Sequence, residues 1–347
     1  MSGHDVYLVG SVPMASASDV FREVCAAVGP RLRWLPDGET GDRQDWVAGL
    51  EFVFKNNPAF EPSGRVFKIH PTSVAKMRSN LRPGIKPEDV DFGDLGYARG
   101  AIASYAEFAK LQAAGVIPPR VKFQVDLVPA HSVLWLFVED EWHAALDAPY
   151  NNAVKRELAE IVSAIPRDKL AIQYDVASAV FARLERDENS AYGANKREAT
   201  ERFARILIDL GNEVPEGVDL LYHFCYGDSN HRHVVEPTDM SDMVAMANRI
   251  DAGLKRPAQL YHMPVPRDRD DDAYFAPLAG LKVRPETELC LGLVHHTDGE
   301  EGALRRMATA RRHARDFLVG TECGFGRRPP DTIPRLLKIH AAAASAP

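Results

Sequence analysis

Residues that can bind a metal ion follow several of the short apolar runs in this sequence. They are His223 and Cys225 at the end of one run, His262 late in the next, and Cys323 at the end of the last. Residues two apart in a strand point to the same side, so His223 and Cys225 can face one interior. Imidazole and thiolate ligands together favour zinc in tetrahedral geometry. The alternative is that the cysteines are core residues and the histidines are hydrogen-bonded.

Other polar residues also lie near the ends of the apolar runs. They are Ser11, Glu39, Asp175 and His296. A buried carboxylate without a partner is costly, so Asp175 at the end of an apolar strand should meet a cation. Glu39 has an alternative role as a carboxylate at the start of a helix. Of the neighbours His295 and His296, we expect one to face the site and the other the helices.

Eight short apolar segments are predicted to be buried parallel strands that position these residues. They span residues 6–11, 32–36, 122–128, 170–176, 220–226, 259–265, 288–294 and 318–324, with a weaker candidate at 66–70. Apolar residues at helical spacing predict helices over residues 19–28, 97–114, 152–165, 196–210, 239–253, 300–317 and 331–343. Asp331 is a candidate cap for the last helix.

This alternation predicts an α/β fold, a (β/α)8 TIM barrel with loop insertions at its C-terminal face, as one domain over residues 1–347. Barrel enzymes carry their chemistry at the C-terminal ends of the strands, where the polar residues above lie. A doubly wound open sheet is the alternative. The first strand leads into VGSVPMA, which lacks the G-x-G-x-x-G fingerprint of a dinucleotide-binding sheet.

Composition excludes several classes of protein. The chain has 347 residues and a formal net charge of −7, which argues against a nucleic-acid or anionic-membrane partner. We find neither a secretory signal nor an apolar run long enough to span a membrane. The four cysteines are too few for a disulfide scaffold, so a reducing cytoplasm is the expected location.

Six motifs together resemble a known family. They are VGSVP (9–13), DGETGDRQDWV (37–47), IQYDV (172–176), YHFCYGD (222–228), LVHHTDG (293–299) and GTECGFGRR (320–328). In this order they resemble the C-terminal catalytic barrel of cobalamin-independent methionine synthase, within the group that shares its fold with uroporphyrinogen decarboxylase. Val176 stands where that family has an acidic residue, so the use of folate as the methyl donor is left open.

The resemblance implies roles for the candidate residues. His223, Cys225 and Cys323 match zinc ligands, and His262 takes the place of the family's glutamate ligand. If His262 stays off the metal, water fills the fourth position. Three residues match positions that hold the amino and carboxyl groups of homocysteine, namely Ser11, Glu39 and Asp175. His296 matches a histidine that assists proton transfer, so Asp175 and His296 are the expected catalytic residues.

The sequence therefore predicts a zinc-dependent methyltransferase similar to 5-methyltetrahydropteroyltriglutamate–homocysteine methyltransferase. Zinc would convert a small-molecule thiol into a thiolate that attacks a methyl or alkyl donor. A second hypothesis is a zinc-dependent carbon–sulfur lyase or thiol–epoxide transferase of the same superfamily. A third is a non-catalytic zinc- or ligand-binding relative, in which four protein ligands would enclose the metal. The oligomeric state is left open.

Overall fold

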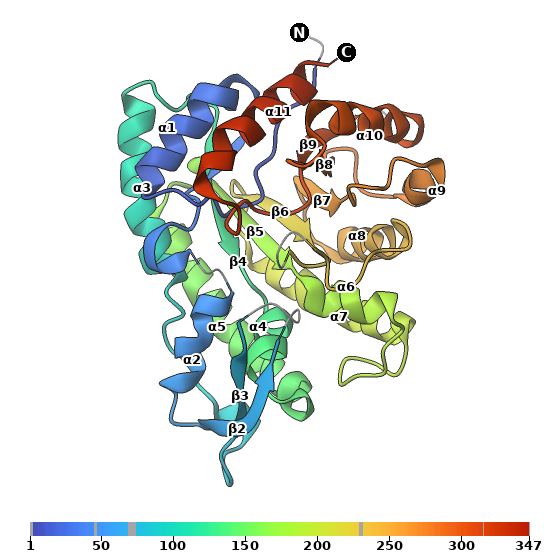
Figure 1. Cartoon of the computed structure of the whole chain (residues 1–347). Coiled ribbons are helices and arrows are strands. Elements are labelled where there is room, and N and C mark those ends of the chain that lie inside the picture. The colour runs from blue at the N-terminus through green and yellow to red at the C-terminus, as the bar shows by residue number, and fades with distance from the viewer. Residues whose placement is uncertain (1–2, 45–46, 69–73, 229–231, 315, 347) are drawn as a thin grey trace.

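The main sheet is parallel and curls into a half-barrel, with helices packed on its outer face (Figure 1). The computed structural model describes residues 3–44, 47–68, 74–228, 232–314 and 316–346. The sheet has seven strands in the order β1-β4-β5-β6-β7-β8-β9. Their bounds are β1 Trp34–Pro36, β4 Lys122–Leu127, β5 Leu170–Val176, β6 Asp219–Phe224, β7 Leu260–Pro264, β8 Glu288–Val294 and β9 Leu318–Thr321. This architecture is consistent with a TIM-barrel-like fold.

The expected first strand, residues 6–11, is not a regular strand. Val6 forms isolated parallel bridges to Leu32 and to Val319, so this segment lies between the two edges of the sheet. The backbone bends at Gly10, and Pro13 has no amide hydrogen to extend a ladder. The predicted closed barrel of eight strands is therefore corrected to a curled sheet of seven strands.

Both faces of the sheet are buried, which explains the nearly continuous apolar runs of its strands. Every residue of β5 is buried, for example. The inner face carries its own packed layer below the functional residues. This layer consists of Tyr7, Val9, Trp34, Ala171, Leu221, Leu260, Cys290 and Leu318. The polar side chains of the candidate site therefore lie against a closely packed layer.

The seven predicted helices are present, with shifted ends. The helices are α1 Ala17–Val28, α2 Glu51–Lys55, α3 Tyr97–Ala113, α4 Ala130–Phe137, α5 His143–Ala164, α6 Ser178–Glu185, α7 Lys196–Glu213, α8 Ser241–Gly253, α9 Asp272–Phe275, α10 Gly299–His313 and α11 Ile333–Ser345. The sequence did not predict α2, α4, α6 and α9. Asp331 lies in a 3-10 turn before α11 rather than capping it. Among the described residues, we find no helix with the length and apolarity needed to cross a membrane.

A separate antiparallel hairpin projects from the main sheet (Figure 1). It consists of β2 Phe60–Phe67 and β3 Lys76–Leu81, with Val66 opposite Met77. The weaker strand candidate at 66–70 overlaps the end of β2, and its residues 69 and 70 lie outside the described residues. It is therefore part of an insertion and not of the parallel sheet.

Candidate metal and substrate site

Three predicted metal ligands lie together at the C-terminal edge of the sheet. His223 is on β6, Cys225 follows that strand, and Cys323 follows β9; their ligand atoms lie within 4.8 Å of one another. The two sulfur atoms are 3.7 Å apart. Two sulfurs bound to one tetrahedral zinc are about 3.8 Å apart, because each zinc–sulfur bond is about 2.3 Å. The donor set and its spacing therefore fit zinc.

The turn after β6 fixes the position of Cys225. The Cys225 N–H donates to the Val176 carbonyl at 3.0 Å, and the Gly227 N–H donates to Cys225 Sγ at 3.2 Å. Gly227 has φ of +96°, a conformation that glycine adopts without steric cost. The hydrogen bond with Cys225, together with burial, raises the pKa of the Cys323 thiol, which disfavours its thiolate in the absence of a cation.

His262 lies beside this cluster without joining it. Its Nδ1 is 2.7 Å from Nδ1 of His223, and its Nε2 is 2.9 Å from the Thr321 carbonyl oxygen. Both of its nitrogen atoms are thus occupied by protein partners. Burial lowers the pKa of His223 and lowers that of His262 to about 4. Both imidazoles are therefore neutral near pH 7.

Three buried carboxylates lie close together on neighbouring elements, and the name acidic pocket below refers to these side chains. Glu39 is only 4% exposed, and neither of its carboxylate oxygens has a hydrogen-bond partner among the described residues. Asp126 on β4 accepts from Gln124 Nε2 at 3.0 Å, and Asp175 on β5 accepts from Gln173 Nε2 at 2.7 Å. We define Glu39, Asp126 and Asp175 as the acidic pocket.

Gly10 allows the backbone to approach two of these carboxylates. A Cβ at position 10 would lie 2.3 Å from Asp126 Oδ2 and 3.8 Å from Glu39 Oε1. The first distance is a clash, so a residue with a side chain would displace Asp126. Glycine at position 10 therefore lets the backbone bend close to Asp126 without a steric clash.

Burial and mutual repulsion raise the pKa values of two carboxylates of the acidic pocket. Burial raises the pKa of Glu39, and the neighbouring carboxylates of Asp126, Asp175 and Asp37 raise it further. Burial and Asp175 likewise raise the pKa of Asp126. Arg43 opposes these shifts. A cation placed among the three carboxylates would allow them to ionise.

Asp37 holds Glu39 in place. Its Oδ1 accepts the Glu39 N–H at 2.8 Å, and its Oδ2 accepts from Arg43 at 2.5 Å. Glu39 has φ of +52°, which is unusual for a residue with a side chain. Such strain is typical of functional positions. Glu39 thus belongs to a shaped turn and not to the start of a helix.

Asp126 is not among the residues predicted from the sequence. A signal for it exists, because β4 and β5 carry the same Gln-x-Asp pattern, at 124–126 and 173–175. In both strands the glutamine amide donates to the aspartate two residues later. The two strands are neighbours and parallel, so the two aspartates face the same interior.

Ser11 lies against the loop that follows Cys323. The Ser11 carbonyl accepts the Phe325 N–H at 2.6 Å. A Cβ at Gly324 would lie 2.6 Å from Ser11 Oγ, which shows how closely the hydroxyl approaches this loop. Ser11 therefore lies between Gly10, which approaches the acidic pocket, and the loop that follows Cys323.

The two histidines after β8 have different environments. His295 is buried, its Nε2 bonds to the Val265 carbonyl at 2.8 Å, and its Nδ1 is 3.5 Å from Glu322 Oε1. His296 is half-buried in the turn that follows. His296 therefore remains the one nearer to solvent at this edge of the sheet.

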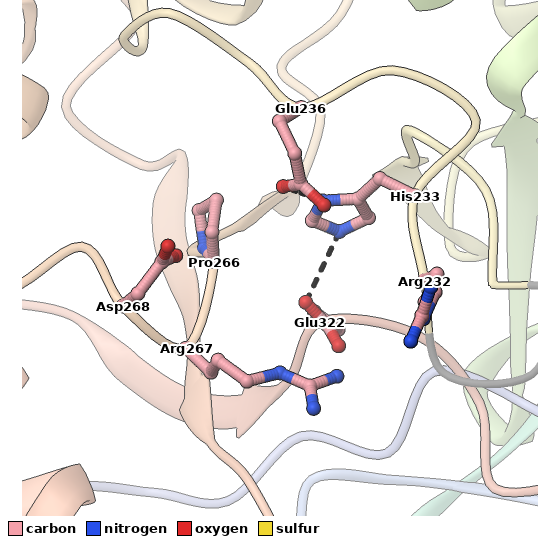
Figure 2. Close-up of a pocket in the computed structure, with 7 residues that line it drawn as sticks. All are labelled: Arg232, His233, Glu236, Pro266, Arg267, Asp268 and Glu322. Carbon is pink, nitrogen blue, oxygen red and sulfur yellow. Dashed lines mark hydrogen bonds and ion pairs between the residues drawn. The ribbon is translucent and has the colours of Figure 1, made fainter.

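Glu322, the residue before Cys323, lies in the wall of a polar pocket of about 370 Å³ (Figure 2). It is lined by Arg232, His233, Glu236, Pro266, Arg267, Asp268 and Glu322. His233 lies between two carboxylates, 2.7 Å from Glu236 and 3.0 Å from Glu322. These hydrogen bonds overcome burial and raise the pKa of His233 to about 10, while His295 and His233 lower that of Glu322 to about 2. In the wall of the pocket, a protonated His233 thus bridges the carboxylates of Glu236 and Glu322; we call this contact the His233 bridge.

The fold resembles that of solved methionine synthases. A structure from Listeria monocytogenes, assigned as a vitamin-B12-independent methionine synthase, matches with a TM-score of 0.55 and 13% identity, over 98% of this chain and 96% of that chain. A B12-independent methionine synthase from Shewanella sp. W3-18-1, in complex with selenomethionine, matches with a TM-score of 0.62 and 12% identity, over 99% and 97% of the two chains. No protein-family model and no curated sequence matches the chain. At these identities the comparison establishes the fold.

Proposed function

We propose that this protein is a zinc-dependent transferase that activates a thiol for methyl or alkyl transfer. The observation that carries the proposal is the cluster of His223, Cys225 and Cys323, whose ligand atoms lie within 4.8 Å of one another. Bound zinc would lower the pKa of a coordinated thiol, so that the thiol is a nucleophilic thiolate at neutral pH. Three protein ligands with a further, exchangeable position are typical of catalytic zinc sites. A non-catalytic relative with four protein ligands is less consistent with this arrangement.

The substrate in this proposal is a thiol that also carries an ammonium group. Asp175 is the parallel-strand partner of His223, so the acidic pocket lies directly beside the proposed metal ligand. Carboxylates with raised pKa values favour a cationic ligand. Homocysteine has both groups. The fold match to a protein solved with selenomethionine, which is itself an amino acid, supports this choice.

The chain's own residues would orient the reaction. Glu39, Asp126 and Asp175 would bind the ammonium, and Ser11 would contact the carboxyl end of the substrate. The sulfur then forms a bond to the methyl or alkyl carbon, and the donor leaves with the electron pair of the broken bond. His296, at the edge of the site, would deliver a proton to that leaving group.

Metal analysis followed by calorimetry with a panel of thiols tests this proposal. We expect about one zinc per chain. We also expect homocysteine and cysteamine to bind more tightly than mercaptobutyrate, which lacks the ammonium. The absence of bound zinc in carefully prepared protein would refute the proposal. Tighter binding of a thiol without an ammonium would instead indicate the thiol–epoxide transferase or lyase chemistry.

A further inference from the structure

We infer that His262 is a positioning residue, which holds His223 in the form that binds metal through Nε2, and that His262 is not itself a ligand. The inference rests on the proposed zinc site and goes beyond it, because it assigns a role to a residue outside the ligand cluster. Two contacts carry it: His262 Nδ1 to His223 Nδ1 at 2.7 Å, and His262 Nε2 to the Thr321 carbonyl oxygen at 2.9 Å.

The hydrogen positions follow from these contacts. A carbonyl oxygen only accepts hydrogen bonds, so Nε2 of His262 must carry the hydrogen that it shares with Thr321. Nδ1 of a neutral His262 is then an acceptor, and Nδ1 of His223 must be the donor to it. A neutral His223 with its hydrogen on Nδ1 has its lone pair on Nε2.

Nδ1 of His223 also has no room for a metal. That atom lies 2.7 Å from another nitrogen, whereas a zinc–nitrogen bond alone takes about 2.0–2.1 Å. Nε2 is therefore the atom that can bind zinc. Metal-binding histidines commonly donate their other N–H to a protein acceptor, which fixes the ring orientation. Here the acceptor is a second imidazole.

His262 also braces the two strands that carry the proposed ligands. It is the strand partner of His223 on one side, and it bonds to Thr321 on β9, two residues before Cys323. The Thr321 hydroxyl in turn donates to the Cys323 carbonyl at 2.6 Å. His262 is fully buried, so water would not readily replace it. Turning its ring to the metal would leave a carbonyl and an N–H without partners.

Two replacements of His262 separate positioning from ligation. His262→Gln keeps an acceptor for His223 and a donor for Thr321, whereas His262→Leu removes both. We expect zinc affinity, measured by competition with a chromophoric chelator, to fall about 10- to 100-fold in His262→Leu and to recover largely in His262→Gln. Cys290→Ala is the matched control, because Cys290 is the buried strand partner of His262 on its other side. It should retain wild-type zinc affinity.

A spectroscopic readout identifies the ligands directly. In cobalt-substituted protein, proton NMR should show one strongly shifted, exchangeable imidazole N–H, from His223. Two such signals would show that His262 is a ligand and would overturn the inference. Equal zinc affinity in His262→Leu and wild type would also overturn it. Failure of the wild type to bind zinc would refute the proposed function itself. If His262→Leu does not fold, the NMR spectrum and the His262→Gln affinity still decide between the two roles.

Discussion

Asp175 and His223 are partners across the parallel pair β5 and β6, so a carboxylate of the acidic pocket and a proposed metal ligand leave neighbouring strands side by side. Neighbouring strands lie about 4.8 Å apart. This adjacency matches a small molecule with an amine near its sulfur. The substrate chemistry proposed above therefore depends on the register between two strands.

Zinc content should depend on both cysteines of the cluster. Because each would supply a thiolate ligand, Cys225→Ser and Cys323→Ser should each reduce bound zinc from about one per chain to a small fraction. Plasma emission spectrometry of dialysed protein measures this. Cys25→Ser is the control, since Cys25 lies on α1 and outside the cluster. Zinc retained in both cluster variants would show that the metal binds elsewhere.

Asp126 should contribute to binding of the substrate ammonium. Loss of a hydrogen bond to a charged group costs about 1.5–3 kcal/mol, so Asp126→Asn should weaken homocysteine binding roughly 10- to 100-fold. Binding of mercaptobutyrate should change little. Asp147→Asn, which alters a buried carboxylate on α5, is the matched control. Calorimetry with both thiols measures the two affinities. An equal loss of affinity for homocysteine and mercaptobutyrate would show that Asp126 does not bind the ammonium group.

The acidic pocket should make the protein less stable as pH rises. Glu39 and Asp126 have pKa values raised above those of an unfolded chain, about 4, so the native state holds more protons. The free energy of unfolding therefore falls as pH increases from about 4 through the raised values. Asp126→Asn removes one such group, so its urea midpoint should fall less between pH 5 and pH 8 than that of the wild type. An equal fall in the urea midpoints of the variant and the wild type between pH 5 and pH 8 would contradict this prediction. The other charged groups that face the pair are Asp37, Arg43 and Asp175.

The His233 bridge should stabilise the protein in a pH-dependent way. Glu322 and His233 are both buried, so His233→Ala should lower the free energy of unfolding by about 3 kcal/mol at neutral pH. The native pKa of His233 is about 10, above its unfolded value. The stabilisation is therefore complete below about pH 6.5 and disappears as pH rises through 10. Urea unfolding at pH 6 and pH 10.5 should show the gap between variant and wild type closing.

Replacement of the exposed partner should have a much smaller effect. Glu236 is 65% exposed in its side chain, so Glu236→Gln should cost less than about 1 kcal/mol. If Glu236→Gln lowered the free energy of unfolding as much as His233→Ala does, the stabilising ion pair would be the exposed one with Glu236 and not the buried one with Glu322.

Apolar runs and polar strand ends made part of this molecule predictable. The predicted bounds of β5 and β8 agree with the structure, because buried parallel strands have largely apolar sequences. Polar residues at the ends of two other predicted strands led to His223, Cys225 and Cys323. The β2–β3 hairpin was not predicted, because its mixed exposed and buried residues give no clear period; the candidate strand at 66–70 overlaps only the end of β2.

The role of His262 and the contacts of Asp126 needed three-dimensional information, although the Gln-x-Asp pattern could have singled out Asp126. Strand alternation indicates that a side chain points inward, but it does not specify which atoms it meets. For His262, the decisive fact is the 2.7 Å contact with a histidine on the next strand. For Asp126, it is the close approach of Gly10, which is far away in the sequence.

The contact between Ser11 and Phe325 ties residues near opposite ends of this chain to the edge of the site. Contacts between residues so distant in sequence form late during folding, since a long loop must close first. A growing polypeptide that has made β6 already carries His223 and Cys225 but still lacks Cys323. In the proposed zinc site, full coordination would therefore wait for β9, and metal loading would be a late event that reports on complete folding.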